Sequence, residues 1–290
     1  MIWFKVNLVS SRSDAQIIEE ILVAHNAISI SMFDASGNNP IYEPRIGETP
    51  LWHNVEISAL FEETITKEII DSFLEQIPYS NLIIKKLHNQ NWIEKYQESS
   101  KPIRFGKKLW VVPFNSQEPQ IPYSVNLKMD PGLAFGSGSH ETTHLCLEYL
   151  DQTPPRNFSV LDYGCGSGIL AIAAIKLGAH HTYCLDIDPQ AIISTKDNSR
   201  KNNVDDKIKI ISREDLSSIN VDLIISNILF NTLMELRDCF YNLVKNNGQV
   251  VLSGIMKCQL ELLVEHYEEL FTVTNIRHRK NWSLVELRKH

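Results

Sequence analysis

Three glycines at alternate positions, Gly164, Gly166 and Gly168, stand between an apolar strand pattern and an apolar helix pattern. Glycine tolerates backbone angles that side chains forbid, and it lets the backbone approach a ligand closely. A dinucleotide-binding turn would carry its third glycine one residue later, where Ile169 stands. The spacing therefore disfavours a nicotinamide or flavin cofactor, while the order strand, turn, helix indicates a parallel α/β sheet.

Two aspartates stand at the ends of the strands beside this turn. Asp162 comes two residues before the first glycine, where its carboxylate is expected to orient a ligand amine directly or through water. Asp186 ends the next strand, 22 positions after Gly164, where an acidic side chain can accept hydrogen bonds from both hydroxyls of a ribose. The glycine turn and the aspartate at the end of the next strand together predict a nucleoside-containing ligand. Asp188, followed by Pro189, is interpreted as a helix N-cap.

Polar residues also follow the third and fourth strands. Glu214 and Asp215 are placed either at an adenine edge or in a solvated loop. After the fourth strand, amine methyltransferases often carry Asp/Asn-Pro-Pro-Tyr/Phe, in which the asparagine side chain and the following carbonyl hold the target nitrogen. Asn227 and Phe230 fit this layout, but the missing prolines argue against enzymes that methylate adenine N6 or glutamine N5. We expect Phe135 and Phe230 either to line the ligand-binding cleft or to be ordinary aromatic residues of the hydrophobic core.

The segment before the glycine turn contains a flap and a zinc-like motif. Three glycines within residues 132–138, followed by a helix from about Thr142, predict a mobile flap beside the ligand cleft. Residues 140–144 also satisfy the H-E-x-x-H pattern of zinc peptidases. We expect His140 at or before the helix start, away from the helix face that two zinc ligands must share. No metal site is therefore predicted, and His140 would assist in the flap or cap the helix. A zinc peptidase remains the enzymatic alternative.

Strand and helix patterns alternate from residue 159 onward. This alternation predicts a Rossmann-like seven-stranded sheet that is mostly parallel and ends in a closing antiparallel hairpin. Strands are expected at 160–161, 182–185, 209–211, 223–226, 249–252, 273–276 and 283–287, and helices at 142–150, 169–177, 190–202, 230–244 and 259–270.

The first 90 residues follow the order strand, helix, strand, strand, helix, strand, which is typical of a small ferredoxin-like α+β domain. Ser13 and Gln16 are expected to form a capping box at the start of the first helix. We assign residues 1–88 to this domain, 89–101 to a linker helix and 102–290 to the α/β domain. The strands are expected at 3–9, 28–33, 55–61 and 82–87, and the helices at 13–25 and 67–76.

The net charge of -7 is concentrated in the N-terminal segment. Residues 1–90 contain 6 Lys+Arg and 12 Asp+Glu, a net of -6, which leaves -1 for residues 91–290. An acidic surface favours a basic protein partner over nucleic acid, or it only maintains solubility. Five cysteines without a CxxC pair are typical of a reducing compartment, and neither a membrane span nor a secretory signal is expected. We therefore expect a cytoplasmic protein.

Five ordered motifs resemble the bacterial ribosomal protein L-eleven methyltransferase family over essentially the whole chain. They lie at residues 130–143, 164–174, 186–189, 227–229 and 253–255. The resemblance implies transfer of methyl groups from S-adenosylmethionine to lysine side chains and the N-terminal amine of that ribosomal protein. It also implies that the N-terminal domain of the enzyme binds the ribosomal protein. It implies cofactor contacts at Thr143, Gly164, Asp186 and Asn227, and serines at 137 and 139 replace the family's usual threonines. A catalytically silent cofactor-binding protein is the alternative from another class.

Overall fold

The structure is a computed structural model that describes residues 2–37, 50–88, 101–129 and 140–290. The chain divides into two compact units, Met1–Trp92 and Ile93–His290. The predicted linker helix at 89–101 and the predicted flap lie almost wholly outside the described residues. Within the described ranges, no helix is both long enough and apolar enough to cross a membrane.

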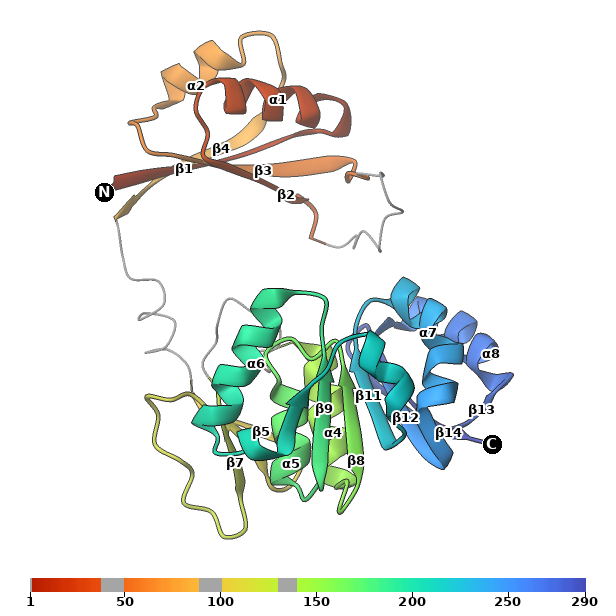
Figure 1. The fold of residues 1–290 in the computed structure, drawn as a ribbon. Helices are drawn as coiled ribbons and strands as arrows, with labels where there is room; N and C mark the ends of the chain where they lie inside the picture. Colours follow the sequence, from red (N-terminus) through yellow and green to blue (C-terminus); the bar gives the residue numbers. More distant parts are fainter. Residues whose placement is uncertain (1, 38–49, 89–100, 130–139) are drawn as a thin grey trace. The chain divides into compact units, whose positions relative to one another are not determined.

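The N-terminal unit is a four-stranded antiparallel sheet with two helices on one face (Figure 1). The sheet order is β2-β3-β1-β4. A cluster of side chains that includes Val6, Leu8 and Ile57 fills the space between this sheet and the helices. The elements are β1 (Ile2–Ser11), α1 (Arg12–Ala24), β2 (Ser29–Asp34), β3 (Asn54–Phe61), α2 (Lys67–Phe73) and β4 (Ser80–His88).

The first helix begins earlier than predicted. Its N-cap is Ser11, whose hydroxyl accepts a hydrogen bond from the backbone N–H of Asp14 at 3.3 Å. The expected capping box from Ser13 to Gln16 is therefore wrong. The reason is tertiary: Ser11 still pairs with Asn54 in the sheet, so the chain passes from strand to helix without a loop.

The C-terminal unit contains a seven-stranded sheet in the order β10-β9-β8-β11-β12-β14-β13. The first five strands in this order are parallel, and β14 runs antiparallel to both of its neighbours. The hairpin of β13 and β14 therefore inserts its second strand beside β12. The strands are β8 (Ser159–Tyr163), β9 (His181–Leu185), β10 (Ile208–Ile210), β11 (Val221–Asn227), β12 (Val244–Met256), β13 (Phe271–Arg279) and β14 (Trp282–Lys289).

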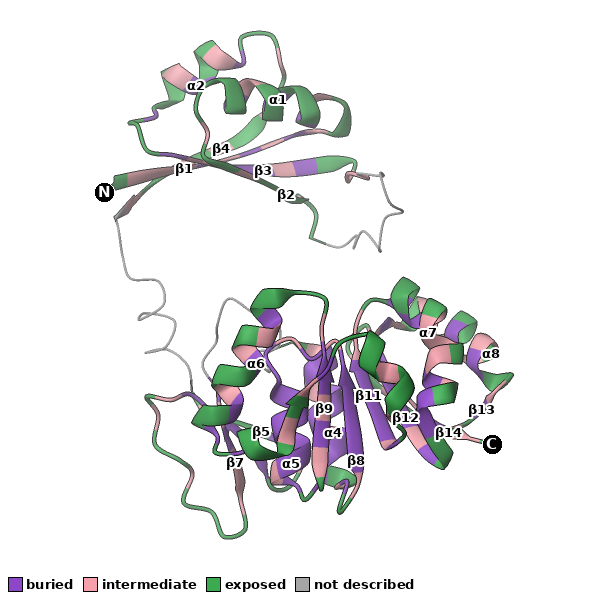
Figure 2. Ribbon diagram, in the orientation of Figure 1, coloured by how far each residue is buried: buried purple, intermediate pink, exposed green. Residues whose placement is uncertain are grey.

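Helices cover both faces of this sheet, and its central strands are buried (Figure 2). Successive residues on one strand join different core clusters, as Ile224 and Ile225 do, because side chains alternate between the two faces. One cluster includes α4 and α5, and the other includes α7 and α8. The helices are α4 (Glu141–Gln152), α5 (Ile169–Lys176), α6 (Pro189–Lys201), α7 (Phe230–Leu243) and α8 (Leu260–Glu268), with short 3-10 helices at Asp205–Lys207, Glu214–Ser218 and Lys257–Gln259.

A third sheet, which was not predicted from the sequence, precedes the glycine turn. It consists of β5 (Ile103–Phe105), β6 (Leu109–Val112) and β7 (Val125–Lys128). The side-chain amide of Asn202, at the end of α6, bonds both the N–H and the carbonyl of Lys128, at 2.8 and 2.7 Å. The small sheet is thereby fixed to the α/β unit.

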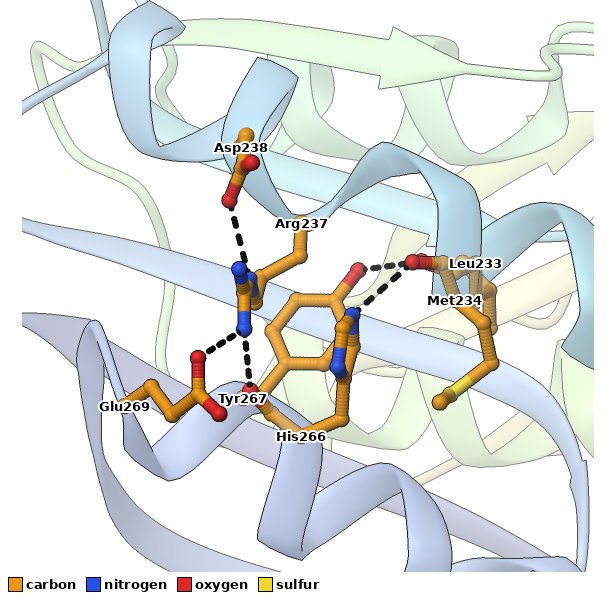
Figure 3. A network of polar contacts seen from close by, with 7 residues as sticks. All are labelled: Leu233, Met234, Arg237, Asp238, His266, Tyr267 and Glu269. Atoms are coloured by element: carbon orange, nitrogen blue, oxygen red, sulfur yellow. Dashed lines mark hydrogen bonds and ion pairs between the residues drawn. The ribbon is translucent and has the colours of Figure 1, made fainter.

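Helices α7 and α8 are joined by polar contacts as well as by packing (Figure 3). Tyr267 on α8 donates its hydroxyl to the carbonyl of Leu233 on α7 at 2.7 Å. Arg237 on α7 donates to the carbonyl of His266 at 3.1 Å and pairs with Glu269. These contacts anchor α7, the helix that follows the end of β11.

Candidate functional site

The predicted glycine turn joins β8 to α5. Gly164, Gly166 and Gly168 all have positive φ angles, of 80°, 53° and 77°. The N–H groups of Gly164 and Cys165 both donate to the carbonyl of Leu185, at 2.8 and 3.1 Å. These bonds tie the turn to the end of β9. Any residue other than glycine would have a strained backbone conformation at these three positions. The positive φ angles therefore explain why all three positions are glycine.

Asp186 lies at the end of β9, directly against the turn. One carboxylate oxygen accepts from the N–H of Gly166 at 2.8 Å, and the other accepts from the N–H of Asp188 at 3.0 Å. A carboxylate has about four acceptor sites, so capacity remains for two further donors. Asp188 itself caps α6 by accepting from the N–H of Gln190 at 2.8 Å, which confirms its interpretation as an N-cap.

Two side chains of α6 also hold the turn, and neither was predicted from the sequence. Thr195 donates its hydroxyl to the carbonyl of Gly166 at 3.0 Å, and Asn198 donates its amide to the carbonyl of Ser167 at 2.9 Å. Their spacing of three positions on a helix next to the turn was the available signal.

Asp162 is completely buried at the end of β8. Its Oδ2 accepts from the N–H of Ala171 on α5 at 3.0 Å, whereas Oδ1 has no hydrogen-bond partner among the described residues. Burial raises the pKa of Asp162 to about 7, the bond from Ala171 opposes this rise, and the nearby charge of Asp186 adds to it. A buried carboxylate with one unpartnered oxygen suits a cationic donor such as an ammonium group.

Asn227 ends β11 and meets a residue that lies 84 positions earlier. Its amide donates to the hydroxyl of Thr143, in the first turn of α4, at 3.2 Å. Ser226, just before it, donates to the carbonyl of Tyr163 at 2.8 Å and holds β11 against β8. Thr143 and Asn227 are thus brought together, beside the strand that leads into the glycine turn.

Two residues of the zinc-like motif, His140 and Glu141, are engaged in other contacts. His140 is the N-cap of α4: its Nδ1 accepts from the N–H of Thr142 at 3.4 Å and lies 2.7 Å from the hydroxyl of that residue. Glu141 forms ion pairs with Arg279 and Lys280. In the part of the chain that the structure describes, no cluster of three or more His, Cys, Asp or Glu side chains could hold a metal ion.

The remaining predicted site residues lie elsewhere. Phe230 is buried in the core cluster beneath α7, which is the core-aromatic alternative for this residue. Phe135 lies outside the described residues. Asp215 accepts from the N–H and hydroxyl of Ser212 within an exposed loop, at 2.8 and 2.9 Å. Glu214 begins a 3-10 helix in that same loop.

The arrangement fits S-adenosylmethionine. The turn requires glycine at position 164, because a side-chain Cβ there would lie 2.3 Å from Ile228 Cγ2. Asp186 offers acceptors suited to ribose hydroxyls, and Asp162 offers the unpartnered oxygen. With β14 antiparallel in an otherwise parallel core, the sheet and this turn define a methyltransferase-like α/β protein.

Comparison with known proteins gives the family. The family model described as ribosomal protein L11 methyltransferase matches residues 2–290. A protein of that name from Hahella chejuensis is 37% identical over 291 residues, covering 100% of this chain and 99% of its own. One from Shewanella sp. strain ANA-3 is 37% identical over 288 residues, covering 98% of each chain.

A solved structure agrees with these sequence matches. The ribosomal protein L11 methylase of Lactobacillus delbrueckii subsp. bulgaricus is 30% identical, with a TM-score of 0.60, covering 66% of this chain and 100% of its own. The chain belongs to the ribosomal protein L11 methyltransferase family. Its cofactor is S-adenosylmethionine, as predicted from the sequence.

Proposed function

We propose that this protein transfers methyl groups from S-adenosylmethionine to lysine side chains and the N-terminal amine of ribosomal protein L11. The observation that supports the proposal is the contact between Asn227 and Thr143, because Asn227 carries a neutral amide and follows Ser226, which bonds to the end of β8 before the glycine turn. Family membership over residues 2–290 supports the substrate assignment. As a protein that acts on a ribosomal component, it would work in the cytoplasm.

The cofactor would be held by residues from four elements. Asp186 would accept from the ribose hydroxyls, and the unpartnered oxygen of Asp162 would face the amine of the cofactor, directly or through water. Ile187, which is 81% exposed beside Asp186, offers an apolar surface to the adenine ring. The proposed cofactor-binding residues are Thr143, Asp162, Gly164, Gly166, Gly168, Asp186 and Asn227.

The bound cofactor supplies a methyl group on a sulfonium, and the chain's own residues would align the amine that receives it. Alignment of two reactants contributes up to about 7–11 kcal/mol. The amine must be neutral, which costs about 4.6 kcal/mol at pH 7 for a lysine with a reference pKa of about 10.4. Asn227 would accept the amine N–H without stabilising the ammonium form as strongly as a carboxylate would. His140 would act as a helix cap, and Phe230 as a core residue.

The N-terminal unit would recognise the substrate. Its strand and helix order and its sheet order β2-β3-β1-β4 support a ferredoxin-like domain at residues 1–88, joined by residues 89–101 to a methyltransferase domain at 102–290. Its net charge of -6 suits a basic ribosomal protein and disfavours nucleic acid.

Mass spectrometry of purified ribosomal protein L11 after incubation with enzyme and cofactor tests the proposal. We expect mass increases in multiples of one methyl group, located on lysine side chains and the N-terminus. Cofactor binding without any turnover would instead support the silent binding protein.

A further inference from the structure

Gly254, near the end of β12, lies against the backbone of Ile228. A Cβ built at Gly254 would lie 2.0 Å from the carbonyl oxygen of Ile228 and 2.9 Å from its carbonyl carbon. Gly254 has a φ of +89° and stands where the register between β12 and β14 shifts. Both the backbone angle and the close approach therefore require glycine at this position.

The contacted carbonyl immediately follows Asn227. Asn227 is opposite Ser253, the last pair between β11 and β12, so Gly254 adjoins the first residue beyond the paired strands. Ser253 donates its hydroxyl to the carbonyls of Thr142 and Ser283, both at 3.3 Å. The glycine therefore stands on a segment that is fixed to α4 and to β14.

We infer that Gly254 is a positioning residue for the target amine, because its bare Cα sets the position of the Ile228 carbonyl beside the Asn227 side chain. This inference rests on the proposed function, in which the asparagine amide and the following carbonyl together hold the nitrogen. Two acceptors in fixed geometry direct the nitrogen lone pair toward the methyl group, and a displacement of about 1 Å can cost about a hundredfold in rate. Of the proposed cofactor contacts, Asp162, the glycine turn and Asp186 lie on or directly after β8 and β9, whereas Asn227 and Thr143 lie close to the Gly254 segment.

The test is a comparison of Gly254→Ala with Gly248→Ala. Gly248 also lies on β12, in its first half, where a Cβ would lie 2.6 Å from Val244 Cγ2. It therefore reports the general effect of crowding this strand. We expect Gly254→Ala to lower kcat on ribosomal protein L11 by about tenfold to a hundredfold while the Kd for S-adenosylmethionine changes by less than about threefold. Gly248→Ala should lower the melting temperature and leave kcat near that of the wild type.

A second pair covers the case in which Gly254→Ala does not fold. Leu229 is exposed and follows Ile228, so Leu229→Gly adds backbone freedom beside the carbonyl without removing a buried contact. We expect a lower kcat for Leu229→Gly than for Leu229→Ala, at equal cofactor affinity. Equal kcat values for that pair, wild-type kcat in a folded Gly254→Ala, or parallel loss of kcat and cofactor affinity would each overturn the inference. A wild-type enzyme that fails to methylate ribosomal protein L11 would reject the proposed function instead.

Discussion

The carboxylate of Asp186 accepts a hydrogen bond from the backbone N–H of Gly166 at 2.8 Å, which ties the end of β9 to the glycine turn after β8. The proposed ribose acceptor therefore also fixes the backbone that the cofactor would approach. A substitution of Asp186 is therefore expected to affect both the ribose contact and the backbone conformation of the glycine turn.

Asp186→Ala should weaken S-adenosylmethionine binding by at least about tenfold, because loss of charge-assisted hydrogen bonds costs about 1.5–3 kcal/mol. Titration calorimetry measures this affinity. Asp188→Ala is the control: it removes only the cap of α6, which should reduce stability by about 0.5–2 kcal/mol and leave the affinity unchanged. Unchanged affinity in Asp186→Ala would reject the ribose assignment.

The buried carboxyl of Asp162 should make stability depend on pH. Burial raises its pKa from 3.8 to about 7, so between these values the folded state binds a proton that the unfolded state lacks. Stability from this group is therefore complete at low pH and is lost as the pH rises toward 7 and above. Urea unfolding at pH 5 and pH 8 should show this loss in the wild type but not in Asp162→Asn. Parallel pH profiles for the two proteins would contradict the assignment.

The same carboxyl should couple cofactor binding to proton release. An ammonium group placed near the unpartnered oxygen would lower the pKa of Asp162 and ionise it. Calorimetry at about pH 6.5, in buffers that differ in ionisation enthalpy, should show release of protons on binding of S-adenosylmethionine, and less release in Asp162→Asn. Binding enthalpies independent of the buffer would show that the amine lies elsewhere.

Turnover should not depend on a metal ion. Glu141, the general base if the H-E-x-x-H motif were a zinc site, is paired with Arg279 and Lys280. Exhaustive chelation should leave methyl transfer intact, and Glu141→Gln should retain activity within about threefold, since Glu141 serves here in ion pairs with the partly exposed Arg279 and Lys280 and such pairs contribute little. Activity abolished by chelation and restored by zinc would refute the site as proposed.

The N-terminal unit should be required for the protein substrate and dispensable for the cofactor. It has a hydrophobic cluster of its own, as does the C-terminal unit. A fragment starting at Lys101 should bind S-adenosylmethionine yet lose most methylation of ribosomal protein L11, because docking energy far from the methyl group provides alignment. A fragment that matches the full-length rate would contradict this division of labour.

Salt tests the electrostatic part of that division separately. If exposed carboxylates of residues 1–90 attract the basic substrate, its KM should rise with ionic strength, since charges are screened over about 8 Å at 0.15 M. Steady-state kinetics at several salt concentrations, with the cofactor Kd measured in parallel as a control, give the answer. A KM independent of salt would reject electrostatic attraction but not substrate recognition by the N-terminal unit.

Ile228 should determine how much the turn tolerates a side chain. In Gly164→Ala the new methyl group would lie 2.3 Å from Ile228 Cγ2, in addition to strain of about 1–2 kcal/mol from the positive φ. Adding Ile228→Leu removes the Cγ2 branch at similar volume and should restore part of the lost stability and cofactor affinity. Adding Ile228→Val keeps that branch and should restore neither. Equal effects of the two second-site changes would exclude the contact.

The local features of the site were predictable from the sequence. The glycine turn and the cap at Asp188 depend on residues that are neighbours in the chain, where backbone angle and capping chemistry decide the outcome. The position of Asp186 beside the glycine turn was also predictable from the sequence, because the carboxyl ends of parallel strands lie at one edge of a sheet. The order of strands and helices was also predictable from the hydrophobic periodicity. The predicted helix ends differ from the observed ones by one to three residues, as at the C-terminal end of α2.

Which distant residues meet depends on the packing of the folded chain and was not predictable from the sequence. Thr143 and Asn227 are 84 positions apart, and nothing in their local patterns indicates a hydrogen bond. The strands β5 to β7 are three or four residues long, too short to show a periodicity, and they form because Phe105, Leu109 and Leu127 can be buried against α4 and α5. The approach of Ile228 to Gly254, like the burial of Asp162, is likewise a property of packing, since it depends on how β11, β12 and their helices come together.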